Sequence, residues 1–291
     1  MTNQAVFRFA PSPNGALHLG HALSAFITHD LARETGGRFL LRIEDIDVER
    51  CRPEYEAQML EDLAWLGLAW EEPVRRQSQH FETYAKALGK LEAMGLLYPC
   101  FVSRKEIAIH AKAGHNDPDG APIYPGLHKG LSSTEIDARK AAGEAFALRL
   151  HMDKAIEMAR TMSPGPLSFR ELDPASGEIK TTAAEPARWG DAVIARKDVP
   201  TSYHLAVVVD DAGQDVTHVT RGQDLYAATG IHRLLQVLLA LPEPLYHHHA
   251  LLCDEAGRKL SKSHKDKALA SLRDEGATPE DIRRMAGISK S

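Results

Sequence analysis

The sequence predicts an α/β fold around a parallel sheet, and two observations lead to this prediction. Near the N-terminus, Val6–Ala10 is a short apolar segment, Leu19–Thr35 has apolar residues at three- and four-residue steps, and Arg38–Ile43 is apolar again. A strand, a helix and a strand in this order normally form a parallel pair with a right-handed crossover. Later in the chain, Tyr203–Val209 is an unbroken apolar run before two aspartates, which we interpret as a buried parallel strand.

The region after the first unit alternates helical and irregular patterns. Glu54–Leu66 and Ser78–Met94 are amphipathic and end near glycines, which predicts two helices. Residues 100–131 contain four glycines and three prolines, so we expect a loop-rich insertion there. Ala145–Leu150 is a candidate strand, and residues 162–194 alternate short apolar pieces with turn residues, which is typical of strands and loops.

The last part of the chain predicts shorter elements. Val216–Val219 is a candidate strand, and Ile231–Leu241 is a candidate helix that ends at prolines. After Ser263 we expect short helices alone, one of which begins at Thr278 with a capping residue, a proline and an acidic residue in order.

Composition narrows the class of protein. The 291 residues carry a net charge of -5, which excludes binding through bulk positive charge but leaves room for a local basic face. No apolar run approaches the ~20 residues of a membrane span, and the N-terminus lacks a signal-peptide pattern. Cys51, Cys100 and Cys253 are odd in number and far apart, which argues against a disulfide framework. We therefore expect a cytoplasmic protein without membrane contact.

His18-Leu19-Gly20-His21 stands where the first strand leads into the first helix. A helix N-terminus attracts anions through its N–H groups and dipole, and Gly20 lets a ligand approach the backbone. His18 and His21 share one face of the first turn and can donate to phosphate oxygens. The alternative is a pair of solvated histidines. The position at the carboxyl end of a strand favours a phosphate site.

Lys259-Leu260-Ser261-Lys262-Ser263 is the second polar motif. Lys259 and Lys262 lie three residues apart between hydroxyl side chains, and lysines bind phosphate as point charges. Alone, this motif is more often a solvated basic loop. Its occurrence together with the two histidines favours a phosphate clamp. By contrast, His247-His248-His249 does not have metal-ligand spacing, because consecutive side chains diverge.

Five motifs occur in the order in which class I glutamyl-tRNA synthetases carry them. They are Arg8–Pro13, His18–His21, Arg42–Asp47, Arg221–Leu225 and Lys259–Ser263. The sequence resembles that family over essentially its whole length. It is most similar to the truncated branch without an anticodon-binding part, because 28 residues follow Ser263.

The resemblance implies a class I Rossmann-like parallel sheet with a loop-rich inserted subdomain. The catalytic domain is then expected over residues 1–99 and 189–263. The inserted subdomain, with a degenerate zinc-site region and an acceptor-binding part, is expected over residues 100–188. A short C-terminal helical segment would cover residues 264–291.

The resemblance also implies a two-step ligase reaction. Glutamate attacks the α-phosphorus of ATP, usually with Mg²⁺ present, and the glutamyl group of the adenylate then moves to a hydroxyl of an RNA. His18, Gly20, His21 and Lys262 would bind ATP. The catalytic residues would be His18, His21, Lys259 and Lys262, with Lys262 at the pentavalent phosphorus. Positioning and charge stabilisation are the main contributions of protein to such transfers.

Charge complementarity identifies candidates for the glutamate pocket. Arg8 and Arg221 are candidates for the two carboxylates, because guanidinium binds carboxylate in a bidentate fork. Glu44 is the candidate for the ammonium group, with an ion pair to Arg42 as the alternative.

Three further residues complete the predicted pocket. Tyr203 would supply a phenolic hydrogen bond, although it could instead belong to the core edge. Ala10 and Ser12 lie in the loop that the family wraps around the substrate. His204 stands where glutamyl-tRNA synthetases tend to carry a small amide residue, and its role is open at this point.

The resemblance to the truncated branch implies that the acceptor is queuosine in the anticodon of tRNA(Asp), and that the protein is a monomer. Candidate basic contacts to the RNA are Arg104, Lys105, Lys129, Arg196 and Lys197. Three alternatives stay open. They are charging of tRNA(Glu), a small-molecule nucleotidyltransferase, and a non-catalytic RNA-binding relative. The intact motifs argue against the last two.

The zinc motif of the truncated branch is incomplete in this sequence. The branch often carries Cys-x-Cys and Tyr-x3-Cys, whereas this chain has Cys100, Val102, Tyr124 and His128 at those positions. Tetrahedral zinc needs four N, S or O ligands. Cys100, Tyr124 and His128 are therefore weak metal candidates, and we expect zinc to be absent.

Overall fold

The structure is a computed structural model that describes residues 4–252 and 267–288. Seven of its strands form one sheet: β1 Val6–Phe9, β2 Arg38–Ile43, β3 Glu71–Arg76, β6 Ser168–Leu172, β7 Ile179–Ala183, β9 His218–Gly222 and β10 Leu245–His249. The strand order is β3-β2-β1-β9-β10-β6-β7, and neighbours are parallel except β6 and β7. The predicted α/β fold with a parallel sheet is confirmed.

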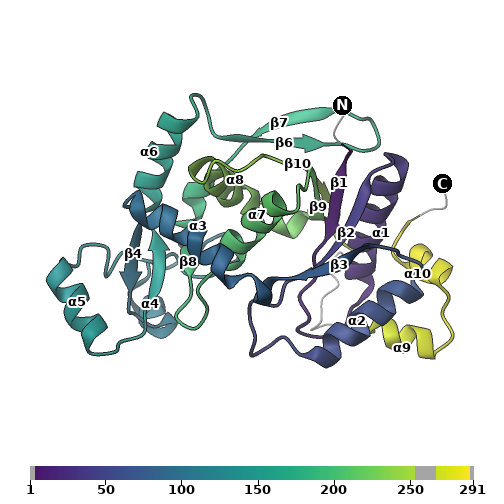
Figure 1. The fold of residues 1–291 in the computed structure, drawn as a ribbon, viewed down its shortest axis with the longest axis horizontal. Helices are drawn as coiled ribbons and strands as arrows, with labels where there is room; N and C mark the ends of the chain where they lie inside the picture. Colours follow the sequence, from purple (N-terminus) through teal and green to yellow (C-terminus); the bar gives the residue numbers. More distant parts are fainter. Residues whose placement is uncertain (1–3, 253–266, 289–291) are drawn as a thin grey trace.

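Helices cover both faces of this sheet. The longer helices and the two at the C-terminus are α1 Leu19–Glu34, α2 Pro53–Trp65, α3 Phe81–Ala93, α6 Met152–Met162, α7 Tyr203–Gly213, α8 Ala228–Leu238, α9 Leu269–Asp274 and α10 Pro279–Met285. Helix α1 packs on β1, β2 and β9, while α10 contacts α1 and α9 contacts α2. Helix α7 contacts α3 and α8, and α6 contacts α8. Figure 1 shows α1, α9 and α10 at one end of the molecule.

Alternate residues of the central strands face opposite sides of the sheet, as the pleat requires. Phe7 and Phe9 of β1 belong to a core with residues of α1, α2, α9 and α10. Arg8, between them, faces α7 and contacts Asp211. Arg42 of β2 contacts the same aspartate. The strand period thus brings two arginines to the α7 side of the sheet.

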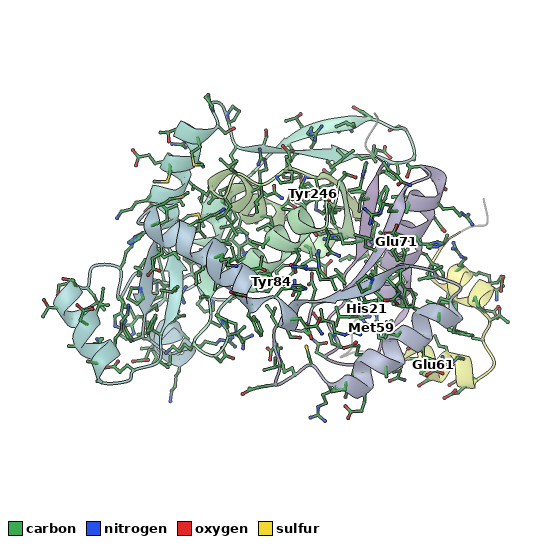
Figure 2. The ribbon with its side chains drawn as sticks, in the orientation of Figure 1. His21, Met59, Glu61, Glu71, Tyr84 and Tyr246 are labelled. Carbon is green, nitrogen blue, oxygen red and sulfur yellow. The ribbon has the colours of Figure 1, made fainter. Side chains whose placement is uncertain are left out.

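Separate hydrophobic cores occupy the two sides. Met59 of α2 lies in the core beneath α1, and Tyr84 of α3 lies in the core with α6, α7 and α8 (Figure 2). Tyr246 of β10 belongs to a smaller cluster with residues of β1, β6 and β9. All three side chains are nearly or fully buried.

The prediction of a strand at Tyr203–Val209 is wrong, because these residues form the first turns of α7. Every residue from Leu205 to Asp211 is buried. A helix that is packed on all sides is apolar all round and has no polar face, so the spacing of its apolar residues does not distinguish it from a buried strand. Asp210 and Asp211, which we interpreted as the start of a turn, lie within this helix. Their carboxylates contact arginine side chains from strands of the main sheet.

A second, antiparallel sheet lies at the other end of the molecule (Figure 1). Its strands are β4 Leu97–Cys100, β5 Ala147–Leu150 and β8 Val193–Ala195, in the order β4-β5-β8. Two helices, α4 Arg104–His110 and α5 Ser133–Ala141, lie between β4 and β5 along the chain. Strands β6 and β7, from the range assigned to the insertion, pair with the main sheet, whereas β8 does not. The division into domains stays a prediction.

Most of the other predicted elements are confirmed. These are β1, α1, β2, α2, α3, β5, β9, α8 and the short C-terminal helices. Thr278 caps α10 as expected, since its side chain accepts a hydrogen bond from the Asp281 N–H. No pattern predicts β3 or β10, because charged residues and histidines replace the usual apolar alternation. Among the described helices, none has the length and apolar character needed to cross a bilayer.

Candidate active site

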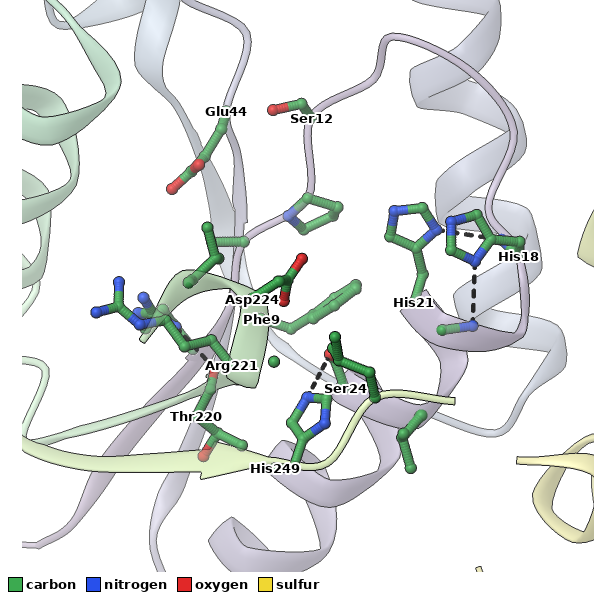
Figure 3. A pocket seen from close by; sticks show the side chains of 18 of the residues that line it. Phe9, Ser12, His18, His21, Ser24, Glu44, Thr220, Arg221, Asp224 and His249 are labelled. Carbon is green, nitrogen blue, oxygen red and sulfur yellow. Dashed lines mark hydrogen bonds between the residues drawn. The ribbon is translucent and has the colours of Figure 1, made fainter. Parts of the chain in front are cut away.

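A cavity of about 770 Å³ lies where β1, β2, β9 and β10 end, beside the N-terminus of α1 (Figure 3). Open parallel sheets bind ligands at the carboxyl ends of their strands. Nine of the predicted site residues line this cavity: Arg8, Ala10, Ser12, His18, Gly20, His21, Glu44, Tyr203 and Arg221. They come from four separate parts of the chain. Lys259 and Lys262 lie outside the described residues.

The two histidines of the first motif form the start of α1. The Nδ1 atom of His18 accepts a hydrogen bond from the Gly20 N–H (3.1 Å), and Nδ1 of His21 accepts one from the His18 N–H (3.2 Å). Each neutral ring therefore carries its hydrogen on Nε2, as a donor. A Cβ atom on Gly20 would lie 3.0 Å from Cε1 of His18, so the absence of a side chain also makes room for this ring.

A buried cluster of arginines and carboxylates adjoins the cavity, because two of its members, Arg8 and Glu44, line it. Nε of Arg8 lies 3.0 Å from Asp211, and Nη1 of Arg42 lies 2.8 Å from the same Oδ1 atom. Burial opposes ionisation of Asp211, but the charges of Arg8 and Arg42 outweigh it and lower the pKa. The carboxylate is therefore ionised at neutral pH and orients both guanidinium groups.

The sequence left two alternatives for Glu44, a place in the substrate pocket and an ion pair with Arg42, and the structure contains both. Its Oε1 atom lies 3.3 Å from Nη2 of Arg42, so the ion pair exists, and the side chain also lines the cavity. Burial raises the pKa of Glu44, against the attraction of Arg42 and Arg8. A second cation at this carboxylate, such as an ammonium group, would favour the ionised form.

Arg221 has a different environment. Its guanidinium donates to Nδ1 of His232 (3.1 Å), to Nε2 of His248 (3.3 Å) and to the hydroxyl of Thr229. Burial and the charge of Arg221 lower the pKa of both histidines, that of His248 to about 2. The partners are therefore neutral. Unlike Arg8 and Arg42, Arg221 forms no ion pair with a carboxylate of the described residues.

Several residues of the cavity were not predicted. Asp211, which does not line the cavity but holds Arg8, was missed because its helix was interpreted as a strand. His249 also lines the cavity, and its Nε2 atom lies 2.7 Å from the hydroxyl of Ser24 (Figure 3). The three consecutive histidines do diverge, since His247 contacts the carbonyl of Leu172. Their position at the end of a strand was the signal that could have identified His249.

The region that corresponds to the zinc motif of the truncated branch is a packed cluster of Tyr98, Cys100, Ile107 and Tyr124. Nδ1 of His128 accepts a hydrogen bond from the Phe101 N–H (3.1 Å), and the His128 N–H donates to the Tyr124 hydroxyl (2.6 Å). Val102 offers no ligand atom. The residues at these positions therefore do not fit a tetrahedral metal site.

A second cavity of about 750 Å³ lies between the antiparallel sheet and α7. Tyr203 lines both cavities, and Arg104, Arg149, Arg196 and Lys197 line the second. Several predicted basic contacts already have partners. Arg196 pairs with Asp47 (2.9 Å) and Lys129 with Asp191 (2.9 Å), while Lys197 donates to the Phe101 carbonyl. Lys105 is exposed on α4.

Comparison with known proteins gives the family. The family model "tRNA synthetases class I (E and Q), catalytic domain" matches residues 4–288. A solved glutamate-tRNA synthetase from Elizabethkingia anophelis has the same fold, with a TM-score of 0.75 at 24% identity over 98% of this chain and 61% of that one. The chain belongs to the class I tRNA synthetases of the E and Q type, and the predicted class I Rossmann-like fold is confirmed.

The similar curated proteins are more specific. A Rhodobacter capsulatus protein named Glutamyl-Q tRNA(Asp) synthetase is 48% identical over 97% of this chain and 100% of its own length. A Symbiobacterium thermophilum protein of the same name is 40% identical over 94% and 83%. The glutamate–tRNA ligase of Aquifex aeolicus is 37% identical over 94% of this chain and 55% of its own length. The predicted resemblance is confirmed, and this chain is a ligase of the glutamate–tRNA ligase type, in a family that uses ATP as substrate.

Proposed function

We propose that this chain activates L-glutamate with ATP in the absence of RNA, and then transfers the glutamyl group to queuosine in the anticodon of tRNA(Asp). The observation that carries the proposal is the gathering of nine predicted site residues around one cavity. The relatives named Glutamyl-Q tRNA(Asp) synthetase support the choice of acceptor.

In the first step, an oxygen of the α-carboxylate attacks the α-phosphorus of ATP and pyrophosphate leaves. His18 and His21 are proposed to donate from Nε2 to phosphate oxygens at the N-terminus of α1. Lys262, outside the described residues, is proposed to stabilise the pentavalent phosphorus, assisted by Lys259. The chemistry needs charge stabilisation and alignment more than proton transfer.

The amino-acid substrate is held by charge. Arg221 keeps an uncompensated positive charge and is the cation for one carboxylate. Arg8 contributes a second guanidinium, although its charge is shared with Asp211. Glu44 is proposed to take the ammonium group, and Tyr203 to donate a hydrogen bond. Ala10 and Ser12 close the loop over the substrate.

In the second step, a hydroxyl of queuosine attacks the glutamyl carbonyl and AMP leaves. Tyr203 connects the second cavity to the first, and this second cavity supports the step because polar and charged residues line it, among them Arg104 and Arg149 together with Asp117 and Asp119. A nucleoside extruded from an anticodon loop is held by such a pocket and by contacts to the backbone phosphates. Arg104 and Lys105 of α4 are the candidate phosphate contacts.

Mg²⁺ belongs to the proposal as the ion that accompanies ATP. It keeps several waters and binds chiefly through phosphate oxygens, where it would neutralise developing charge. Among the described residues, no group of three or more His, Cys, Asp or Glu side chains is placed to hold a metal ion. The absence of zinc, a monomeric state and a cytoplasmic location stay predictions, and elemental analysis tests the first.

The test combines two assays. Glutamate-dependent exchange between ATP and pyrophosphate without RNA should be clear, aspartate should be a poor substrate, and Lys262→Ala should lower the rate by roughly one to three decades. Labelled glutamate should then appear on tRNA(Asp) that contains queuosine and not on tRNA(Asp) that lacks it. Efficient charging of tRNA(Glu), or equal labelling of both tRNA(Asp) forms, would contradict the proposed acceptor.

A further inference from the structure

Arg221 is 5% exposed, and the protein supplies it with hydrogen-bond acceptors but with no counter-charge among the described residues. A buried guanidinium without a carboxylate partner lowers the stability of the fold, and a ligand that carries an anion can compensate for this cost when it binds. Neutral acceptors satisfy the N–H groups and leave the charge intact. The environment of Arg221 is therefore suited to a substrate carboxylate and unsuited to a purely structural role.

The contacts that lead from Arg221 through His232 to His204 have one possible assignment of hydrogen-bond donors and acceptors. A guanidinium can only donate, so Nδ1 of His232, 3.1 Å from Nη1 of Arg221, must present a lone pair. A neutral ring then carries its hydrogen on Nε2. That atom lies 3.1 Å from Nδ1 of His204, which must accept. His204 therefore carries its own hydrogen on Nε2, and its Nδ1 lone pair satisfies the Nε2–H of His232.

The second series of contacts leads from Arg221 through His248 to Glu171. The His248 ring has the opposite tautomer to His232, and it also presents a lone pair to Arg221. Nδ1 of His248 lies 2.7 Å from Oε1 of Glu171, and Nε2 of the same ring lies 3.3 Å from Nε of Arg221. The carboxylate accepts, so the hydrogen is on Nδ1, and the lone pair of Nε2 faces both the arginine and the Thr229 hydroxyl, which accepts from Arg221 and donates to this atom at 3.0 Å. Both imidazoles thus present lone pairs to one guanidinium.

We propose that His232 and His248 are positioning residues that hold Arg221 in one orientation with its charge undiminished, and that His204 and Glu171 maintain the tautomers of these two rings. The proposal rests on the proposed glutamate site, in which Arg221 binds a carboxylate of the substrate. A carboxylate in place of either imidazole would orient Arg221 equally well, but it would neutralise the charge that the substrate needs. This accounts for the open role of His204, which contacts His232 and not Arg221.

The kinetic test compares two substitutions of His204. His204→Leu leaves the Nε2–H of His232 buried without its acceptor, so this ring is no longer held in place against Arg221, and the KM for glutamate in ATP–pyrophosphate exchange should rise roughly tenfold. The KM for ATP and kcat should change less than threefold. His204→Asn places Oδ1 where the imidazole has Nδ1, and it should restore the KM for glutamate. The proposal would be overturned if both variants had equal effects, or if the KM for ATP rose as much as the KM for glutamate.

A second measurement does not depend on the substrate or on any variant. The ¹⁵N resonances of the histidine rings in the intact protein should show His232 protonated on Nε2 alone and His248 on Nδ1 alone. An imidazolium, or the reverse tautomer at either ring, would refute the arrangement around Arg221. If exchange with glutamate is absent while these tautomers are found, the proposed function fails and the hydrogen-bond arrangement stands.

Discussion

Two buried arginines of this protein, Arg42 and Arg221, have opposite environments. Arg42 is fully buried and contacts the carboxylates of Asp211 and Glu44, with Asp210 4.0 Å away. Arg221 contacts two imidazoles and a hydroxyl. The protein neutralises the first charge itself and leaves the second for a ligand. The type of partner, more than burial, separates an arginine that holds the fold together from one that binds substrate.

Arg8 lies between these two cases. It lines the cavity, like Arg221, but it shares Asp211 with Arg42 and also donates to the Thr220 carbonyl. We therefore expect its substitution to lower both stability and affinity for glutamate. The comparison of Arg42 with Arg221 is the sharper one, and two predictions test it; a third extends it to a buried carboxylate, Asp62.

Arg42→Met should have the largest effect, on stability. Removing this guanidinium leaves Asp210, Asp211 and Glu44 without a shared cation, and breaking a buried pair of this kind costs about 3–5 kcal/mol. The midpoint of urea or thermal unfolding should fall accordingly. The control is Arg38→Met, whose exposed pair with Glu71 should be worth less than about 1 kcal/mol. A variant that unfolds like the wild type would remove the structural role assigned to Arg42.

Arg221→Lys should act on catalysis instead. The lysine keeps a charge but loses the planar fork and the contacts to His232 and His248. We expect kcat/KM for glutamate in ATP–pyrophosphate exchange to fall about 100-fold, roughly 2.7 kcal/mol, with the unfolding midpoint nearly unchanged. Loss of stability comparable to that of Arg42→Met, with normal kinetics, would reverse the assignment of the two arginines.

Asp62→Asn should have the smallest effect, with the opposite sign. Asp62 is fully buried on α2, where its nearest cation is Arg273 at 3.4 Å, and neither carboxylate oxygen accepts a hydrogen bond. Burial raises the pKa of Asp62 from 3.8 to about 6, against the attraction of Arg273. The folded state therefore binds an additional proton between these values, and the charge of Asp62 destabilises the fold above pH 6.

At pH 8 the substitution should raise the melting temperature by a few degrees, about 1 kcal/mol. The gain should shrink below pH 6 and vanish near pH 4. Glu61→Gln is the matched control, because Glu61 contacts the same arginine from an exposed position. A gain that is independent of pH would show that packing, and not the buried charge, explains it.

Local patterns predicted much of this fold. The β1–α1–β2 unit, the cap at Thr278 and the histidine motif at the start of α1 are visible in the sequence, because the residues that determine them lie within a few positions of one another. Nine site residues that were named through the resemblance to a family line one cavity. Their individual roles stay proposals.

The pairing of distant groups was decided by the tertiary structure. Arg8 and Arg42 meet Asp211 across 203 and 169 residues, and no local period carries that information. Helix α7 was misjudged for the same reason, since a helix covered on every side has no polar face. The imidazoles around Arg221 come from α8 and β10, which are brought to β9 by the order of the strands.

The sequence by itself determined which chemical groups this protein has, where its first strands and helices begin and end, and which family it resembles. The tertiary structure alone decided which charges are neutralised and which are left for a ligand. The physical reason is that a residue's identity sets its charge, whereas its partners set the cost of burying that charge, and partners are chosen by packing.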